Sequence, residues 1–209
     1  MSLHLPGFHR RGLLRGLFPV LLTLAASVAS AQSGFPNKPV KLIVPFPPGG
    51  GNDVIARVIG QKLSDRWGQA VVIDNRAGAN GIVGLQALMQ SPADGYTLAV
   101  GAAGPLAVNP SLYARLPYDP VKDFAAVTNL VNYPLLLVVH PSVPVKTTRD
   151  VVALAKAKPG QLSYASPGSG NSGHLAGELF NSMAGVNTLH VPYKGQGPAL
   201  TDLLSGQVH

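Results

Sequence analysis

Short apolar runs rich in β-branched residues alternate with amphipathic runs from residue 38 onward. The first apolar run covers residues 40–46 (VKLIVPF), and aliphatic residues then recur at helical spacing through 53–67. Apolar strands that do not alternate with polar residues are typical of a parallel sheet covered on both faces by helices. The alternation therefore predicts an α/β fold.

The alternation runs twice, which predicts two lobes, each a mostly parallel sheet flanked by helices. We expect lobe 1 over residues 32–131 and lobe 2 over 132–209, with two extended runs near the crossover, 124–130 and 135–140. The other expected strands are 40–46, 70–73, 96–101, 162–165 and 188–191, and the expected helices are 53–67, 82–89, 147–158, 172–184 and 198–205. Residues 206–209 read as a turn and the start of a strand, so we expect lobe 2 to be truncated and the C-terminal part to be missing.

Residues 1–31 contain the three parts of a secretory signal peptide. Three arginines among the first 15 residues precede a short apolar run over 17–28, and Ala29-Ser30-Ala31 provides a small-x-small cleavage site. The alternative is a membrane anchor, but a spanning helix needs roughly 20 apolar residues. We expect cleavage after Ala31 and no stable membrane insertion afterwards. The adjacent arginines leave the export route, Sec or twin-arginine, open.

Composition excludes several classes of function. The chain has no cysteine, which excludes a disulfide, a thiolate metal site and a cysteine nucleophile. The leader takes 3 of the 16 Lys and Arg residues and none of the 9 acids, which leaves a formal charge of +4. These cations are scattered, whereas a nucleic-acid surface gathers them on one element. His140, His174 and His190 are dispersed as well, so we expect neither a nucleic acid nor a metal as partner.

Three loops share one construction, in which an apolar strand leads into a glycine-rich turn and then into a helix: 47–53, 166–173 and 192–198. Open α/β sheets bind ligands outside the carboxyl ends of their strands. The first N–H groups of a helix are unpaired and lie at the positive end of its dipole, which suits an anion. Any one loop can be an ordinary βα turn, but the repetition across both halves favours a site for a small organic anion.

Polar side chains in these loops have more than one reading. Asn52 can face the cleft, while Asp53 is either the N-cap of its helix, a ligand contact or both. Lys194 either meets a carboxylate or is a solvated loop lysine. The hydroxyls of Ser169 and Ser172 suit a carboxylate together with the loop amides.

Residues 168–173 (GSGNSG) also match the dinucleotide pattern G-x-G-x-x-G. The next strand ends at Val191-Pro192-Tyr193 without an acid for a ribose hydroxyl, so we expect no nucleotide and no other cofactor. His174 lies two positions after Ser172 on a helix and points in another direction. It is a loop-bracing or core histidine rather than a general base, and no catalytic residue is predicted.

An ordered series of motifs runs through essentially all of residues 36–209. It consists of 44–57 (VPFPPGGGNDVIAR), 75–81 (NRAGANG), 94–98 (DGYTL), 116–124 (LPYDPVKDF), 138–144 (VVHPSVP), 172–180 (SGHLAGELF) and 190–195 (HVPYKG). The series resembles the substrate-binding proteins of tripartite tricarboxylate transporters, the Bug receptors.

The resemblance implies a two-lobed, hinged periplasmic binding protein, type II-like, that is not an enzyme. It would capture a small organic carboxylate and hand it to membrane transporter subunits. The ligand-binding residues that it implies, with Lys194 added from the loop pattern, are Gly49, Gly50, Gly51, Asn52, Asp53, Ser166, Gly168, Ser169, Gly170, Asn171, Ser172 and Lys194. Asn52 stands where many relatives have Ser or Thr, and residues 101–105 (GAAGP) lack the usual hydroxyls, which leaves the ligand class open.

Two other classes of protein compete with a receptor. An exported α/β hydrolase or transferase would need a nucleophile and a base within reach, and Ser169, Ser172 and His174 are its candidates. The effector domain of a transcription regulator shares the lobed architecture. The leader and the lack of an N-terminal helix-turn-helix argue against the regulator.

Overall fold

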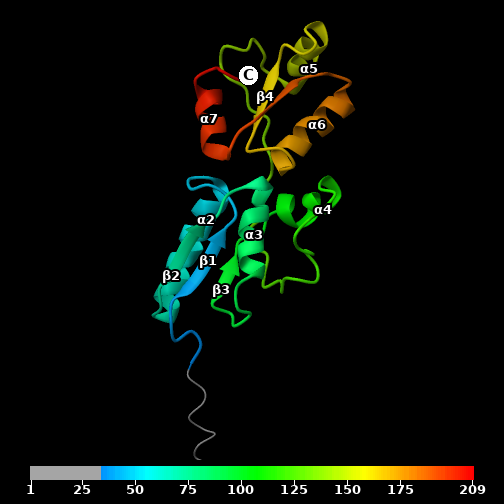
Figure 1. Cartoon of the computed structure of the whole chain (residues 1–209). Helices are drawn as coiled ribbons and strands as arrows, with labels where there is room; N and C mark the ends of the chain where they lie inside the picture. Colours follow the sequence, from blue (N-terminus) through cyan, green and yellow to red (C-terminus); the bar gives the residue numbers. More distant parts are fainter. Residues whose placement is uncertain (1–33) are drawn as a thin grey trace, which may run out of the picture. The chain divides into compact units, whose positions relative to one another are not determined.

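Two separate parallel sheets organise the part of the chain that the computed structural model describes, residues 34–209 (Figure 1). The predicted signal peptide and its cleavage site lie outside the described residues. Residues 38–209 form one compact unit. The observed architecture confirms the predicted α/β class, with parallel sheets flanked by helices.

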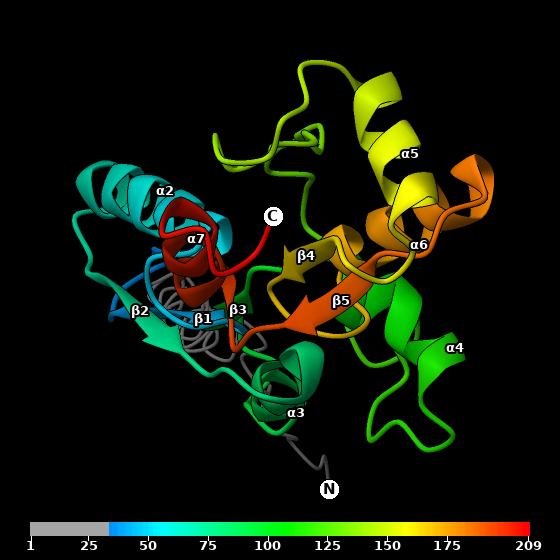
Figure 2. The same cartoon turned by 90° about the horizontal axis from the view of Figure 1, so that it is seen from above.

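The first sheet has the strand order β2-β1-β3, with β1 in the centre. Its elements and the connections around it are β1 (Val40–Val44), α2 (Gly51–Trp67), β2 (Val71–Asn75), η2 (Ala79–Gly81), α3 (Ile82–Met89), β3 (Thr97–Ala99), η3 (Gly104–Val108) and α4 (Asn109–Leu112). The sheet lies between α2 and α3 (Figure 2). This explains why β1 is apolar at almost every position, since four of its five residues are buried.

Register is parallel on both sides of β1. Leu42 is opposite Ile73 on β2 and Leu98 on β3. A buried cluster of Leu42, Val44, Ala56 and Val100 joins this sheet to α2. Full burial of such aliphatic side chains stabilises a fold by roughly 1.5–3 kcal/mol each. The cluster fixes the point from which the first glycine-rich loop leaves β1.

Helix α3 approaches β1 closely because Gly84 has no side chain. A Cβ placed on Gly84 would lie 2.6 Å from Cβ and 2.7 Å from Cα of Pro45. Pro45 directly follows β1, so this contact sets where the chain turns into the first loop. The glycine here is a packing requirement of the helix–strand contact.

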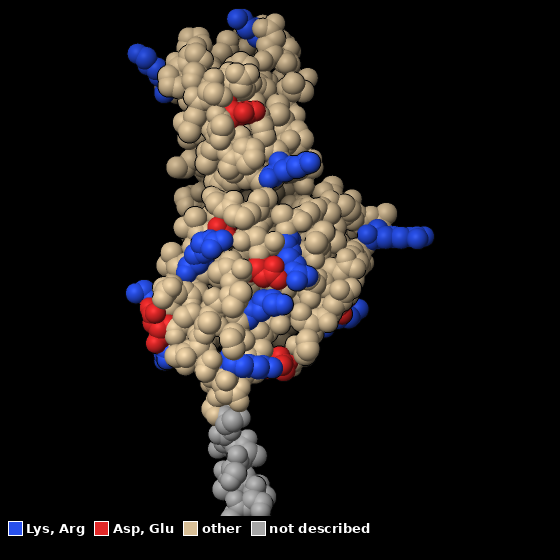
Figure 3. All heavy atoms as spheres, turned by 60° about the vertical axis from the view of Figure 1, so that its left-hand side comes forward, with Lys and Arg blue, Asp and Glu red and all other residues tan. Residues whose placement is uncertain are grey.

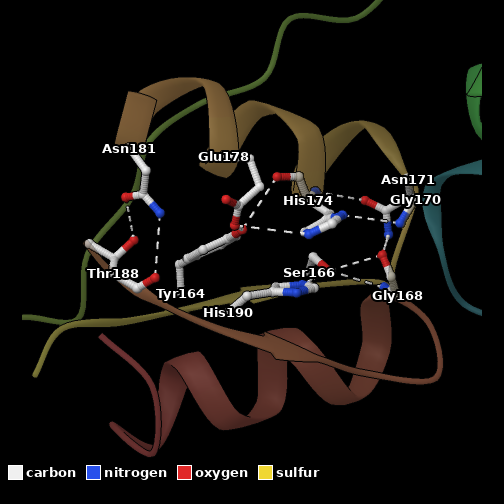
Figure 4. A network of polar contacts seen from close by, with 10 residues as sticks. All are labelled: Tyr164, Ser166, Gly168, Gly170, Asn171, His174, Glu178, Asn181, Thr188 and His190. Atoms are coloured by element: carbon white, nitrogen blue, oxygen red, sulfur yellow. Dashed lines mark hydrogen bonds and ion pairs between the residues drawn. The ribbon is translucent and has the colours of Figure 1, made fainter. Parts of the chain in front are cut away.

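The second sheet is the parallel pair β4-β5. Its elements are α5 (Thr148–Ala157), β4 (Ser163–Ser166), α6 (Ser172–Ala184), β5 (Leu189–Pro192) and α7 (Gln196–Leu204). Helices α6 and α7 cover opposite faces of the pair (Figures 2 and 4). A second buried cluster, Val143, Val151, Ala155 and Leu162, packs α5 against the chain on either side of it.

The extended runs expected at 124–130 and 135–140 form no strand in the described part of the chain. Most of their apolar residues are instead exposed, with Val127 at 81% and Leu136 at 79%. A β-branched run becomes a strand only where a neighbouring strand accepts its backbone hydrogen bonds, and none of the described strands pairs with these residues. The strands predicted at 124–130 and 135–140 were therefore wrong, as far as residues 34–209 show.

Candidate functional site

The loops that leave the two sheets contact one another within residues 38–209. A Cβ on Gly195, after β5, would lie 2.9 Å from Cγ of Pro47, after β1. A Cβ on Gly170, after β4, would lie 3.0 Å from Nδ2 of Asn80, after β2. The glycine-rich strand exits of both halves therefore meet, as the loop pattern predicted.

Asp53 braces the first loop from inside. Its carboxylate is almost fully buried and accepts hydrogen bonds from the amide of Gly49, from Nε of Arg57 and from Nδ2 of Asn75, each at 2.9 Å. The Arg57 hydrogen bond is the main cause that lowers the pKa of Asp53 to about 2, although burial opposes it. The carboxylate is therefore ionised at neutral pH and ties loop, helix and β2 together.

The predicted N-cap role of Asp53 was wrong. Gly50 is the N-cap of α2, and Asp53 is the third residue of the helix. Its side chain reaches back to the amide of Gly49, which has a left-handed φ of 82° that favours glycine. Both carboxylate oxygens are engaged by this brace, so Asp53 shapes the first loop around Gly49, Gly50, Gly51 and Asn52.

Gln196 is a candidate site residue that the sequence pattern did not predict. Its Oε1 accepts the amide hydrogen of Gly51 at 3.0 Å, although the two residues are 145 positions apart. Gly51 is the first residue of α2 and Gln196 the first residue of α7. The N-termini of α2 and α7 thus lie close together, and the dipole of each helix favours negative charge near its N-terminus. Its only sequence signal is the Gly-Gln-Gly-Pro turn ahead of a helix.

The polar side chains of the second loop mainly hold the loop in shape. Ser166 is fully buried, and its Oγ accepts the Gly168 amide hydrogen and donates to the Gly168 carbonyl. Asn171 caps α6, because its Oδ1 accepts the amide hydrogen of His174 at 3.1 Å. Its Nδ2 donates to the Gly168 carbonyl at 2.7 Å. Ser169 is exposed and Ser172 half-buried, so their hydroxyls are the accessible ones.

The third loop places Lys194 on the surface. Tyr193 beside it donates its hydroxyl to Asp202 of α7 at 2.6 Å, and Tyr193 N–H donates to the Ser166 carbonyl. The third loop is thereby fixed to the second loop and to α7. Lys194 is the one positively charged residue among the predicted ligand-binding residues.

Asn80 forms the rim of the first half that meets the second loop. It has a left-handed φ of 50°, and its Nδ2 donates to Oδ1 of the fully buried Asn109 at 2.8 Å. Asn109 in turn donates to the Asn80 carbonyl at 3.2 Å. This reciprocal pair holds η2 and α4 in place under Gly170.

His174 braces the second loop, which confirms one of its two predicted roles. Its Nδ1 accepts the amide hydrogen of Gly170 at 3.1 Å (Figure 4). The contact between Ser166 Oγ and His190 Nε2, at 2.7 Å, has the spacing of a nucleophile and a base. Ser166 is 1% exposed, however, and its hydroxyl is engaged by Gly168, so no substrate can reach it.

Other features of residues 34–209 bear on the function. No three His, Asp or Glu side chains of that part come together as metal ligands. None of its helices has the length and apolar character to cross a membrane. Lys and Arg are scattered over the face that Figure 3 shows rather than gathered in one basic patch. A hollow of about 480 Å³ lined by Leu106, Tyr113, Tyr118 and their neighbours includes none of the predicted site residues.

Comparison with known proteins agrees with this fold. The chain is 42% identical over 194 residues to BugT of Bordetella pertussis, a match that covers 92% of this chain and 59% of BugT. Among solved structures, Rpa4515 of Rhodopseudomonas palustris with adipate has a TM-score of 0.82 at 42% identity, and MatC of the same organism with bound malate has 0.76 at 33%. These cover 84% and 83% of this chain, and the chain covers 59% of each of them.

Parallel sheets flanked by helices, with glycine-rich strand exits that converge, give this chain the α/β fold of periplasmic binding proteins. Residues 55–209 match the tripartite tricarboxylate transporter family receptor. The chain belongs to this family, which confirms the resemblance seen in its motifs. The family consists of binding receptors and not of enzymes. The chain spans about 59% of the length of the curated relatives named above.

Proposed function

We propose that this protein captures a small organic carboxylate, and a dicarboxylate in particular, outside the cytoplasm and delivers it to a tripartite tricarboxylate-type transporter. The observation that carries the proposal is the meeting of the α2 and α7 N-termini at Gly51 and Gln196. Two helix N-termini that lie close together both favour an anion in their vicinity. A relative with adipate and another with malate support the same class of ligand.

One ligand carboxylate would lie at the first loop, against the amides of residues 50–52, with Lys194 supplying a positive charge nearby. The other would meet the second loop, where Ser169 and Ser172 present accessible hydroxyls. Ser166, Asp53 and Asn171 would act through the shape of the loops, because their polar atoms are engaged inside them. Gly168 and Gly170 allow the close approach of the ligand to the backbone.

Export through the predicted signal peptide, cleavage after Ala31 and handover to membrane subunits belong to the same proposal. The location of the family's characterised members supports it, since two structural relatives are described as a periplasmic transporter and a periplasmic binding protein. Mass spectrometry of the exported protein would test the cleavage site. A mature N-terminus at Gln32 is the expected result.

Isothermal titration calorimetry with adipate, malate and a wider carboxylate panel tests the ligand class. We expect submillimolar affinity for at least one dicarboxylate and none for adipamide, its uncharged analogue. Lys194→Gln should weaken that affinity severalfold, while Lys62→Gln on the exposed side of α2 serves as the matched control. No measurable binding of any carboxylate in the panel, or equal binding of the uncharged analogue, would overturn the proposal.

A further inference from the structure

Two histidine rings lie stacked directly behind the second loop. The ring of His174, on α6, is 4.1 Å from the ring of His190, on β5, with 23° between their planes (Figure 4). Tyr164 of β4 stacks on His190 at 5.0 Å. The three rings form a column that joins both strands of the second sheet to the helix that begins at the loop.

The hydrogen bonds fix where the proton of His174 resides. The Gly170 amide donates to Nδ1, so this nitrogen carries a lone pair and the ring hydrogen is on Nε2. Nε2 lies 3.9 Å from Oε1 of Glu178, and the Tyr164 hydroxyl donates to that same oxygen at 2.6 Å. His174 therefore holds the loop through Nδ1, and Nδ1 is also the atom that a second ring proton would occupy.

His190 is constrained in a complementary way. The single proton of the Ser166 hydroxyl goes to the Gly168 carbonyl at 3.1 Å, so His190 Nε2 donates to Ser166 Oγ over 2.7 Å. Burial lowers the pKa of His190, and the adjacent His174 lowers it further, while Glu178 opposes both. Two positive charges on rings 4.1 Å apart repel, so the stacked pair resists a state in which both rings are imidazolium ions.

Few other ionisable groups face this column. Glu178 on α6 contacts two rings of the column, those of His174 and Tyr164, and the Tyr164 hydroxyl is itself ionisable. On α7, which packs on β4, Asp202 is engaged by Tyr193. At the start of β4, His209 bonds Ser163 instead.

Protonation of His174 at Nδ1 would set two N–H groups against each other. Gly170 cannot adapt freely, because it is buried with a φ of 83° and lies against Leu112 and Asn80. Histidine ordinarily changes its charge between pH 5 and 8. The ring contacts the loop from behind, so its effect on a ligand passes through the shape of the loop.

We propose that His174 is a proton-sensitive positioning residue, which holds the loop of residues 166–171 in its binding conformation only while Nδ1 is unprotonated. This inference rests on the proposed function, because the loop is one side of the proposed carboxylate site. Acidification then lowers the affinity for the ligand by releasing Gly170. An asparagine at position 174 can offer Oδ1 in place of Nδ1 and does not titrate.

The test has one readout without ligand and one with adipate as the probe. In the first, the ¹⁵N–¹H resonance of Gly170 is followed from pH 8 to pH 5 in the ligand-free protein. We expect it to titrate in the wild type and to stay fixed in His174→Asn. His140→Asn is the matched control, since Nδ1 of His140 also accepts a backbone amide hydrogen, that of Ser142, outside the loop.

In the second readout, calorimetry compares the affinity for adipate at pH 7.5 and pH 5.5. The wild type should lose about three- to tenfold relative to His174→Asn, as expected for one lost hydrogen bond. Adipate itself titrates equally in both measurements, so the ratio isolates position 174. His174→Ala should bind weakly at both pH values, and circular dichroism checks that it is folded.

The outcomes separate the two proposals. A Gly170 resonance that titrates, in a protein that binds no carboxylate, supports the brace and overturns the proposed function. Adipate binding with a Gly170 resonance that does not titrate overturns the brace and leaves the function intact. Tighter binding of the wild type in acid also overturns the brace, because it would mean that the imidazolium attracts the ligand directly.

Discussion

The Gly51 amide donates to Oε1 of Gln196, so the first residue of α2 is bonded to the side chain of the first residue of α7. A neutral side-chain oxygen thereby occupies a hydrogen-bonding position at the N-terminus of α2, where the helix dipole favours an anion. A ligand carboxylate that approaches Gly51 has to compete with this side chain. In the proposed site, this hydrogen bond would therefore oppose ligand binding.

We predict that Gln196→Ala increases the affinity for adipate by about three- to tenfold, because the competing acceptor of the Gly51 amide is removed. Gln196→Glu should abolish binding, since a tethered carboxylate would take the anion position itself. Calorimetry at pH 7.5 measures both. Gln161→Ala, at an exposed position between α5 and β4, is the control and should change nothing. Weaker binding in Gln196→Ala would show instead that Gln196 holds the ligand.

Replacement of Asp53 should destabilise the protein in a manner that depends on pH. A pKa lowered from 3.8 to about 2 means that the ionised carboxylate contributes stability above about pH 4 and loses it as the pH falls toward 2. We expect Asp53→Asn to lower the free energy of unfolding by about 2 kcal/mol at pH 7. Urea unfolding at several pH values measures this, with the exposed Asp65→Asn of the same helix as control. A loss of the same size at pH 2 would contradict the assignment.

His190 should make the protein less stable in mild acid. Its pKa is lowered in the folded state, first by burial, so the unfolded chain binds more protons just below pH 6.5. The free energy of unfolding then falls as the pH drops through this window. His190→Gln can keep an Nε2–H donor for Ser166 without titrating, and it should flatten this slope. Between pH 7.5 and 9 both proteins should show the same pH dependence, and a slope that stays unchanged in acid would refute the prediction.

Two glycine-to-alanine changes in helices should have opposite signs. Gly84→Ala should cost about 1–3 kcal/mol, because its Cβ would collide with backbone and ring atoms of Pro45. A Cβ at Gly197 in α7 would meet no atom within 4 Å, and Gly197→Ala should gain about 0.5–1 kcal/mol from helix propensity. Thermal and urea unfolding measure both. A neutral Gly84→Ala would mean that α3 can move away from β1.

Patterns that depend on neighbours in the sequence predicted much of this fold. The bounds of α3 and α6 agree with their expected ranges, since apolar spacing and the Gly185 cap define them locally. Residues 124–140 are also rich in apolar and β-branched residues, as a strand would be, yet they form no strand among the described residues. Whether such a run pairs depends on a partner strand, which its own sequence does not specify.

The loops were predictable in kind but not in detail. The helix begins at Gly51, within the run of glycines before Asp53. Asp53 is therefore not the predicted N-cap, and its side chain instead holds the loop in place. The partnership of Gly51 with Gln196 crosses 145 positions and depends on how two sheets meet. The spacing of nearby residues does not reveal a contact between positions so far apart in the sequence, so the sequence pattern did not predict Gln196.

The buried cluster of Leu42, Val44, Ala56 and Val100 lies beneath the first loop and is made of aliphatic side chains alone. Substitutions at exposed loop positions would leave this buried cluster unchanged. A receptor built this way can be redirected by evolution, or by a designer, toward a different acid while its scaffold stays unchanged.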